Sequence, residues 1–160
     1  MFKNNLNCLT PPEKIYLPDG TELRLCKGVV SRTGNRKLYC SKAGLFYSLS
    51  TRGLNPNKPY VTKNFRRKPN VHSYYPRMCG FIGNPYCHLL VAFAWVGPRR
   101  FNHECHHLNG DNTDSRACNL IWLSRTAHRR FDAALKKGLI LERQDPGERM
   151  EYEMTHHMDI

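Results

Sequence analysis

Residues 103–132, HECHHLNGDNTDSRACNLIWLSRTAHRRFD, constrain the fold of this chain more than any other stretch. Residues 104–108 form a short extended run. Asn109 and Gly110 then favour a tight turn, because both residue types tolerate the positive φ angles that such turns need. Residues 120–123, Leu-Ile-Trp-Leu, are a second apolar run and are rich in strand-forming residues. The pattern predicts two strands joined by a loop.

A helix is expected directly after the second run. Ser124 is a suitable N-cap, since its hydroxyl can accept a hydrogen bond from a backbone N–H of the first helical turn. Ala127 and Phe131 lie four residues apart and begin an apolar face, and Gly138 ends the helix. The polar residues that this strand, loop, strand and helix would bring together are His106, His107, Asn119 and His128.

This arrangement resembles the ββα-metal motif of the HNH endonucleases. That motif reads roughly [Asp/His]-His-x-x-Gly-x-x-x-Asp-x-x-x-x-Asn-Leu, followed by a helix that carries His or Asn. Asn119 follows His107 by 12 residues and His128 follows Asn119 by nine, and both gaps fit the family. The resemblance implies a homing-type or phage-type HNH endonuclease, which hydrolyses phosphodiester bonds in DNA by nicking or double-strand cleavage. The matching positions are His106, His107, Gly110, Asp114, Asn119, Leu120 and His128.

By this resemblance, His106 and His128 are metal ligands and His107 is the general base. A neutral imidazole, with an ordinary pKa near 6.5, is suited to deprotonating water at neutral pH. One divalent ion would stabilise the charge on phosphorus and help the leaving oxygen. Mg²⁺ or Mn²⁺ is the first expectation for this cofactor, and Zn²⁺ and Ni²⁺ are further candidates.

Three further polar residues belong to the expected site. Asn119 supplies the middle letter of the motif and is grouped with the catalytic residues, although we expect its amide to tie the loop together rather than to do chemistry. Asp114 supports the same loop. Asp132 lies four residues after the helical histidine, on the same face, and is a candidate third ligand. Its alternative role is an ion pair with Arg129 or Lys136.

The charge of the chain points to a polyanionic partner. The 160 residues contain 25 Lys and Arg against 13 Asp and Glu, a formal net charge of +12. Residues 145–160 hold five of the acidic residues and a single Arg, so the positive excess belongs to residues 1–144. Such a charge favours nucleic acid through phosphate neutralisation, and DNA is the expected partner. Candidate contacts are Arg99, Arg100, Arg116, Arg125, Arg66, Arg67 and Lys68; the alternative is that these are solvated surface charges.

The fold class is predicted as α+β, with a small ββα-metal core and an N-terminal β-rich portion. Residues 1–70 are assigned to a β-rich module with a basic linker, as a candidate DNA-binding part. Residues 71–143 are assigned to the HNH core and residues 144–160 to a flexible acidic tail. Residues 38–50 predict a hairpin that resembles a module often found ahead of HNH motifs. In the linker, Asn55-Pro56 is expected to break regular structure.

A buried helix is predicted over residues 86–96, YCHLLVAFAWV, which are apolar on nearly every face. Asn84 is the expected cap, Pro85 suits the first turn and Gly97 ends the helix. The segment resembles a helix that precedes many HNH motifs. We interpret His88 as a hydrogen-bonded packing histidine rather than a ligand.

Seven cysteines without a CxxC pair argue against a thiolate zinc knuckle and a secreted disulfide framework. The expected location is cytoplasmic, including a phage-encoded protein that acts in the host cell, with no membrane partner and a monomeric or weakly dimeric state. A second hypothesis is a non-catalytic DNA-binding protein that keeps the ββα unit as a zinc-stabilised scaffold. A third is a nuclease that acts on RNA.

Overall fold

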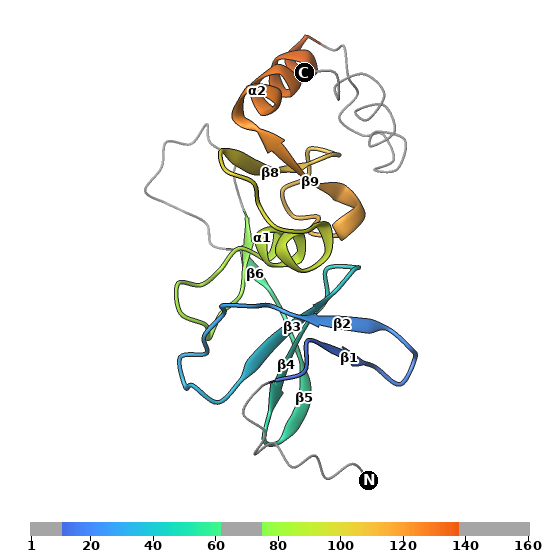
Figure 1. Ribbon diagram of the computed structural model, residues 1–160, viewed down its shortest axis with the longest axis vertical. Helices are drawn as coiled ribbons and strands as arrows, with labels where there is room; N and C mark the ends of the chain where they lie inside the picture. The colour runs from blue at the N-terminus through green and yellow to red at the C-terminus, as the bar shows by residue number, and fades with distance from the viewer. Residues whose placement is uncertain (1–10, 62–74, 138–160) are drawn as a thin grey trace.

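The computed structural model describes residues 11–61 and 75–137 as an α+β protein. A five-stranded antiparallel sheet lies at one end, and a β-hairpin followed by a helix lies at the other (Figure 1). The predicted α+β class is therefore confirmed. The sheet runs in sequence order through β1 (Lys14–Tyr16), β2 (Glu22–Leu25), β3 (Lys37–Ser41), β4 (Phe46–Ser50) and β5 (Gly53–Asn57).

A short turn sets the register of β3 and β4. The hairpin predicted over residues 38–50 is present as β3 and β4, with Tyr39 opposite Tyr47. Gly44 turns the chain between them with a φ of +78°, which a residue with a side chain rarely adopts. The position of Gly44 also brings this turn against a second loop, because a Cβ at Gly44 would lie 3.0 Å from the backbone oxygen of Ser115.

The prediction that Asn55-Pro56 breaks regular structure was wrong. Strand β5 runs through both residues, with Pro56 opposite Tyr47. The strand tolerates proline because β5 is the edge of the sheet, where an N–H is not needed on the outer side. Strand β7 (Pro76–Arg77) pairs with β6 (Tyr60–Val61) in a separate two-stranded sheet.

The predicted central helix begins as α1 (Cys87–Val91) and continues as a π-helical turn, η1 (Ala92–Val96). Gly97 ends it with a φ of +124°, as expected. The capping role of Asn84 was wrong, because Tyr86 is the N-cap and Asn84 adopts a φ of +44°. The Oδ1 atom of Asn84 instead accepts a hydrogen bond from Arg32, 3.0 Å away.

The helix packs its buried side onto the sheet, and the space between them is the hydrophobic core. Trp95 Nε1 donates a hydrogen bond to the Cys40 backbone oxygen at 3.2 Å, and the Arg24 guanidinium lies 4.0 Å from the Trp95 ring centre. Burial is less complete than predicted, since Phe93 is 53% and Val96 39% exposed. The core comprises Cys26, Leu38, Cys40, Phe46, Met78, Phe81, Cys87, Leu90, Val91, Ala92, Ala117 and Leu120.

The predicted strand, loop, strand and helix follow as β8 (His103–His107), a 3₁₀ turn η2 (Ala117–Asn119), β9 (Leu120–Ser124) and α2 (Arg125–Lys136). Ser124 caps α2, because its Oγ accepts a hydrogen bond from the Ala127 N–H at 3.2 Å. The Ala117 N–H donates to the Lys42 backbone oxygen at 2.9 Å and joins this unit to the β3–β4 turn. Within the described ranges, no helix combines the length and apolarity needed to span a membrane.

Candidate metal centre

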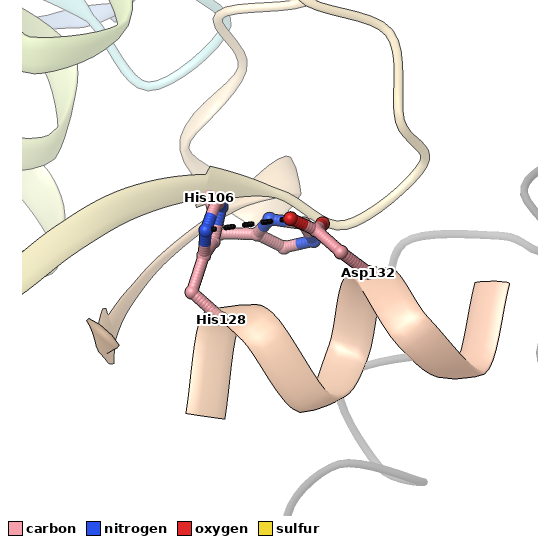
Figure 2. Close-up of side chains that lie close together, drawn as sticks. All are labelled: His106, His128 and Asp132. Carbon is pink, nitrogen blue, oxygen red and sulfur yellow. Dashed lines mark ion pairs between the residues drawn. The ribbon is translucent and has the colours of Figure 1, made fainter. Parts of the chain in front are cut away.

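His106, His128 and Asp132 form a cluster that could hold a metal ion. One ligand atom from each side chain lies within 4.8 Å of the others. Figure 2 shows His106 on β8 facing the two α2 residues, His128 and Asp132, which point toward it from successive turns. His106 is buried, whereas the two helical ligands are half-buried and leave a side open to solvent. The structure thus brings together all three residues predicted as metal ligands.

Strand geometry and helix packing orient the cluster. The His106 ring centre lies 4.3 Å from that of Phe131 and 4.9 Å from that of His128, both on α2. Phe131 is buried and holds α2 against the strand. Cys105 belongs to the other face of β8 and packs on the hydrophobic core, as alternation along a strand requires. A thiolate therefore does not complete this cluster.

Glu104 is a further residue of this site, and the sequence reasoning missed it. Its Oε2 atom lies 3.7 Å from His128 Nδ1. Its Oε1 atom accepts a hydrogen bond from Arg125 Nε at 3.1 Å. The sequence could have indicated Glu104, because it lies two residues before His106 and alternate residues share one face of a strand. The site therefore contains two carboxylates around one imidazole.

The donor set fits a divalent transition metal. Imidazole is a borderline donor that suits Zn²⁺ or Ni²⁺, and a carboxylate is a hard donor that suits Mn²⁺. Three protein ligands leave room for water or a phosphate oxygen, the arrangement found in catalytic rather than structural sites. The metal would be held by His106, His128 and Asp132, and the residues present do not fix its identity.

His107 does not join this cluster. Its ring centre lies 4.9 Å from that of His88 on α1 and 5.9 Å from that of Tyr75, so it faces away from α2. It is buried, and its Nε2 atom has no hydrogen-bond partner among the described residues. Burial lowers the pKa of His107 to about 4, so the imidazole is neutral at pH 7.

His88 packs in the same group of rings. Its ring centre lies 4.9 Å from that of Tyr75, and burial, with a smaller effect of His107, lowers its pKa to about 3. The predicted packing role is confirmed. The predicted hydrogen bond is not made by Nδ1, which is buried and has no partner in the described part of the chain.

Asn119 and Asp114 tie the loop together, as expected. Asn119 is fully buried, donates from Nδ2 to the Asp114 backbone oxygen at 3.0 Å, and accepts from the Asn109 N–H at 2.9 Å. Hydrogen bonds from Arg116 hold the pKa of Asp114 below its usual range. The amide of Asn119 is thus committed to the loop that follows His107, and its role is to position that segment.

The basic residues predicted to contact nucleic acid differ in their neighbours in the structure. Arg116 forms an ion pair with Asp114 at 2.6 Å, and Arg125 forms one with Glu104 at 3.1 Å. Arg99 donates from Nε to the His103 backbone oxygen, and Arg100 is exposed. Contact with nucleic acid stays a prediction for these four. Arg66, Arg67, Lys68 and the acidic tail at residues 144–160 lie outside the described residues.

No protein-family model, curated protein or solved structure matches this chain.

Proposed function

We propose that this chain is a metal-dependent HNH endonuclease that hydrolyses phosphodiester bonds in DNA. The observation that carries the proposal is the cluster of His106, His128 and Asp132, assembled by a strand and the helix that follows its hairpin. His106 and His128 stand at the spacing of the HNH motif. The net charge of +12 supports a polyanionic substrate.

His106, His128 and Asp132 would hold the divalent ion at the substrate phosphate. When bound, this ion supplies charge stabilisation for the phosphorus centre and the leaving 3′ oxygen. Glu104 would orient His128, since a carboxylate beside a ligating imidazole fixes the ring and raises its basicity. Arg125, already paired with Glu104, lies close enough to the cluster to contact a neighbouring phosphate.

His107 would accept the proton of the attacking water. Its pKa of about 4 keeps the ring neutral at pH 7, and its Nε2 makes no hydrogen bond within the described residues. A phosphate anion bound nearby would raise this pKa toward the range in which a general base works well. Asn119 and Asp114 would hold the loop that follows His107.

The burial of His107 favours a second candidate function. A histidine that is 4% exposed is poorly placed to meet a water molecule, and this suits a metal-stabilised DNA-binding scaffold without turnover. The two functions differ in one outcome, since the scaffold binds DNA and leaves it intact.

Cleavage of supercoiled plasmid separates these functions. The protein is incubated with plasmid in EDTA, Mg²⁺, Mn²⁺, Ni²⁺ or Zn²⁺, beside His107→Ala and the control Ile82→Ala, which removes an exposed side chain. The nuclease proposal predicts metal-dependent open circles from the wild type and Ile82→Ala, and none from a folded His107→Ala that still retards DNA on a gel. Intact plasmid under every metal, with retardation, would favour the scaffold.

A further inference from the structure

A short loop, residues 97–102, joins η1 to β8 and carries the most exposed large apolar side chain of the described residues. Phe101 is 97% exposed, whereas the other exposed large hydrophobics lie between 39% and 63%. An apolar side chain of this size contributes no burial energy to the stability of the fold while it is exposed to water. Its exposure calls for an explanation in what the protein binds.

The loop backbone is held in place, so the exposure of Phe101 is built into the structure. Trp122 Nε1 donates to the Gly97 oxygen at 3.0 Å, and the Arg125 N–H donates to the Asn102 oxygen at 3.2 Å. His103 Nδ1 lies 3.0 Å from the Phe101 oxygen. Asn102 adopts a φ of +62°, a left-handed conformation that asparagine tolerates better than most residues with a side chain.

The charge beside Phe101 identifies the class of partner. Arg99 and Arg100 immediately precede it and both are exposed. An aromatic ring next to two guanidinium groups matches nucleic acid, in which stacked bases alternate with phosphates. A second copy of this chain, which also carries +12, would be repelled at such a surface.

The loop lies close to the candidate metal centre along the chain. His106 follows Phe101 by five residues, most of them in β8, which at about 3.3 Å per residue is at most roughly 17 Å. The hydrogen bond from Arg125 to Asn102 also joins the loop to the start of α2, the helix that carries His128. One bound duplex could therefore reach both places, since 17 Å corresponds to about five base pairs.

We infer that Phe101 inserts between base pairs of DNA bound at the candidate metal centre and stacks on the bases that it separates, while Arg99 and Arg100 hold the adjoining phosphates. The inference rests on the proposed function. It adds to the proposed function an uncharged residue, Phe101, that contributes to the affinity for DNA. Phe101 lies in a loop outside the HNH motif.

The salt dependence of DNA binding separates stacking from phosphate contacts. Binding of a short mixed-sequence duplex is measured by fluorescence anisotropy in EDTA over a series of KCl concentrations. Phe101→Ala is expected to weaken binding about tenfold at every salt concentration with an unchanged slope. Arg100→Ala is expected to make the slope shallower by about one unit. Ile82→Ala, which removes another exposed apolar side chain, is the matched control and should bind like the wild type.

The variant Phe101→Trp provides a direct readout of stacking. The wild type contains two tryptophans, and the added indole should restore affinity and be quenched by the duplex, beyond any change in the wild type. Wild-type affinity in Phe101→Ala would overturn the inference, as would an unquenched indole at position 101. If the wild type binds and cuts DNA in either case, the proposed function survives; if it binds no DNA, both fail.

Discussion

His128 Nδ1 lies 3.7 Å from Asp132 Oδ2, and the two residues stand one turn apart on the same face of α2. This spacing lets a single helix supply two of the three candidate ligands, while β8 supplies His106. The geometry favours a ligand role for Asp132 over a surface ion pair, because its carboxylate points at the imidazoles (Figure 2). Metal affinity should therefore depend on this carboxylate.

Replacing Asp132 is expected to weaken metal binding. Asp132→Ala removes one of three ligands and should raise the dissociation constant for Mn²⁺ or Zn²⁺ at least about tenfold. Isothermal titration calorimetry measures the change. Glu13→Ala, which removes an exposed carboxylate paired with Lys27, is the control and should leave the affinity unchanged. Equal affinities for the wild type and Asp132→Ala would show that the ion binds elsewhere.

Asn119→Ala is expected to destabilise the fold by about 3 kcal/mol. The substitution leaves the Asn109 N–H and the Asp114 oxygen, both in half-buried residues, without their partner, and each loss costs about 1–3 kcal/mol. Urea unfolding followed by circular dichroism gives the difference. Asn112→Ala, in the same loop but half-buried, should cost less than about 1 kcal/mol. A cost for Asn119→Ala no greater than that of Asn112→Ala would refute the loop-tying role.

Gly44→Ala tests the contact between the β3–β4 turn and the loop before β9. Its Cβ would lie 3.0 Å from the Ser115 oxygen, and its φ of +78° adds about 1–2 kcal/mol of strain. Gly34→Ala is the matched control, since its φ is +74° with no atom within 4 Å of the added carbon. The urea midpoint should fall clearly further for Gly44→Ala. Equal shifts would mean that the two loops do not pack closely in solution.

His88 is expected to make the protein less stable in mild acid. Burial lowers its pKa to about 3, against an ordinary value of about 6.5, so the unfolded chain binds more protons between these pH values. Stability is therefore fully present above about pH 6.5 and is lost as the pH falls. His88→Phe should lose about 2 kcal/mol less than the wild type between about pH 7.5 and about pH 5 in urea unfolding. Identical losses would exclude His88 as the sensitive group.

Short-range sequence patterns predicted those features of the fold whose contacts join residues close together in the sequence. The Ser124 cap, the hairpin over residues 38–50 and the two strands, the first of which carries the histidine pair, follow from short-range rules, and the structure has all of them. The burial of His107 against His88 could not be read from the sequence, because it depends on how α1 packs beside β8. The hydrogen bond that Asn84 accepts was not predicted for the same reason, since its donor Arg32 is distant in the sequence.

The resemblance to the HNH motif predicted His106 and His128 as ligands, and helix periodicity predicted Asp132. Asp132 lies one helical turn from His128, and β8 must present alternate residues to α2. Strand β5 was not predicted, because the low propensity of proline for strands does not indicate whether a strand lies at the edge of a sheet, where proline is tolerated. Glu104 was missed because the motif does not include its position, although strand alternation places it beside His106.

The most direct test compares two titrations over one Mn²⁺ series: metal binding to the protein, and the initial rate of plasmid nicking. If the cluster is the catalytic centre, half-saturation and half-maximal rate coincide in the wild type. Both should move together to higher Mn²⁺ in Asp132→Ala. Nicking that persists in EDTA, or that keeps its wild-type Mn²⁺ dependence when Asp132→Ala weakens binding, would contradict the proposed function.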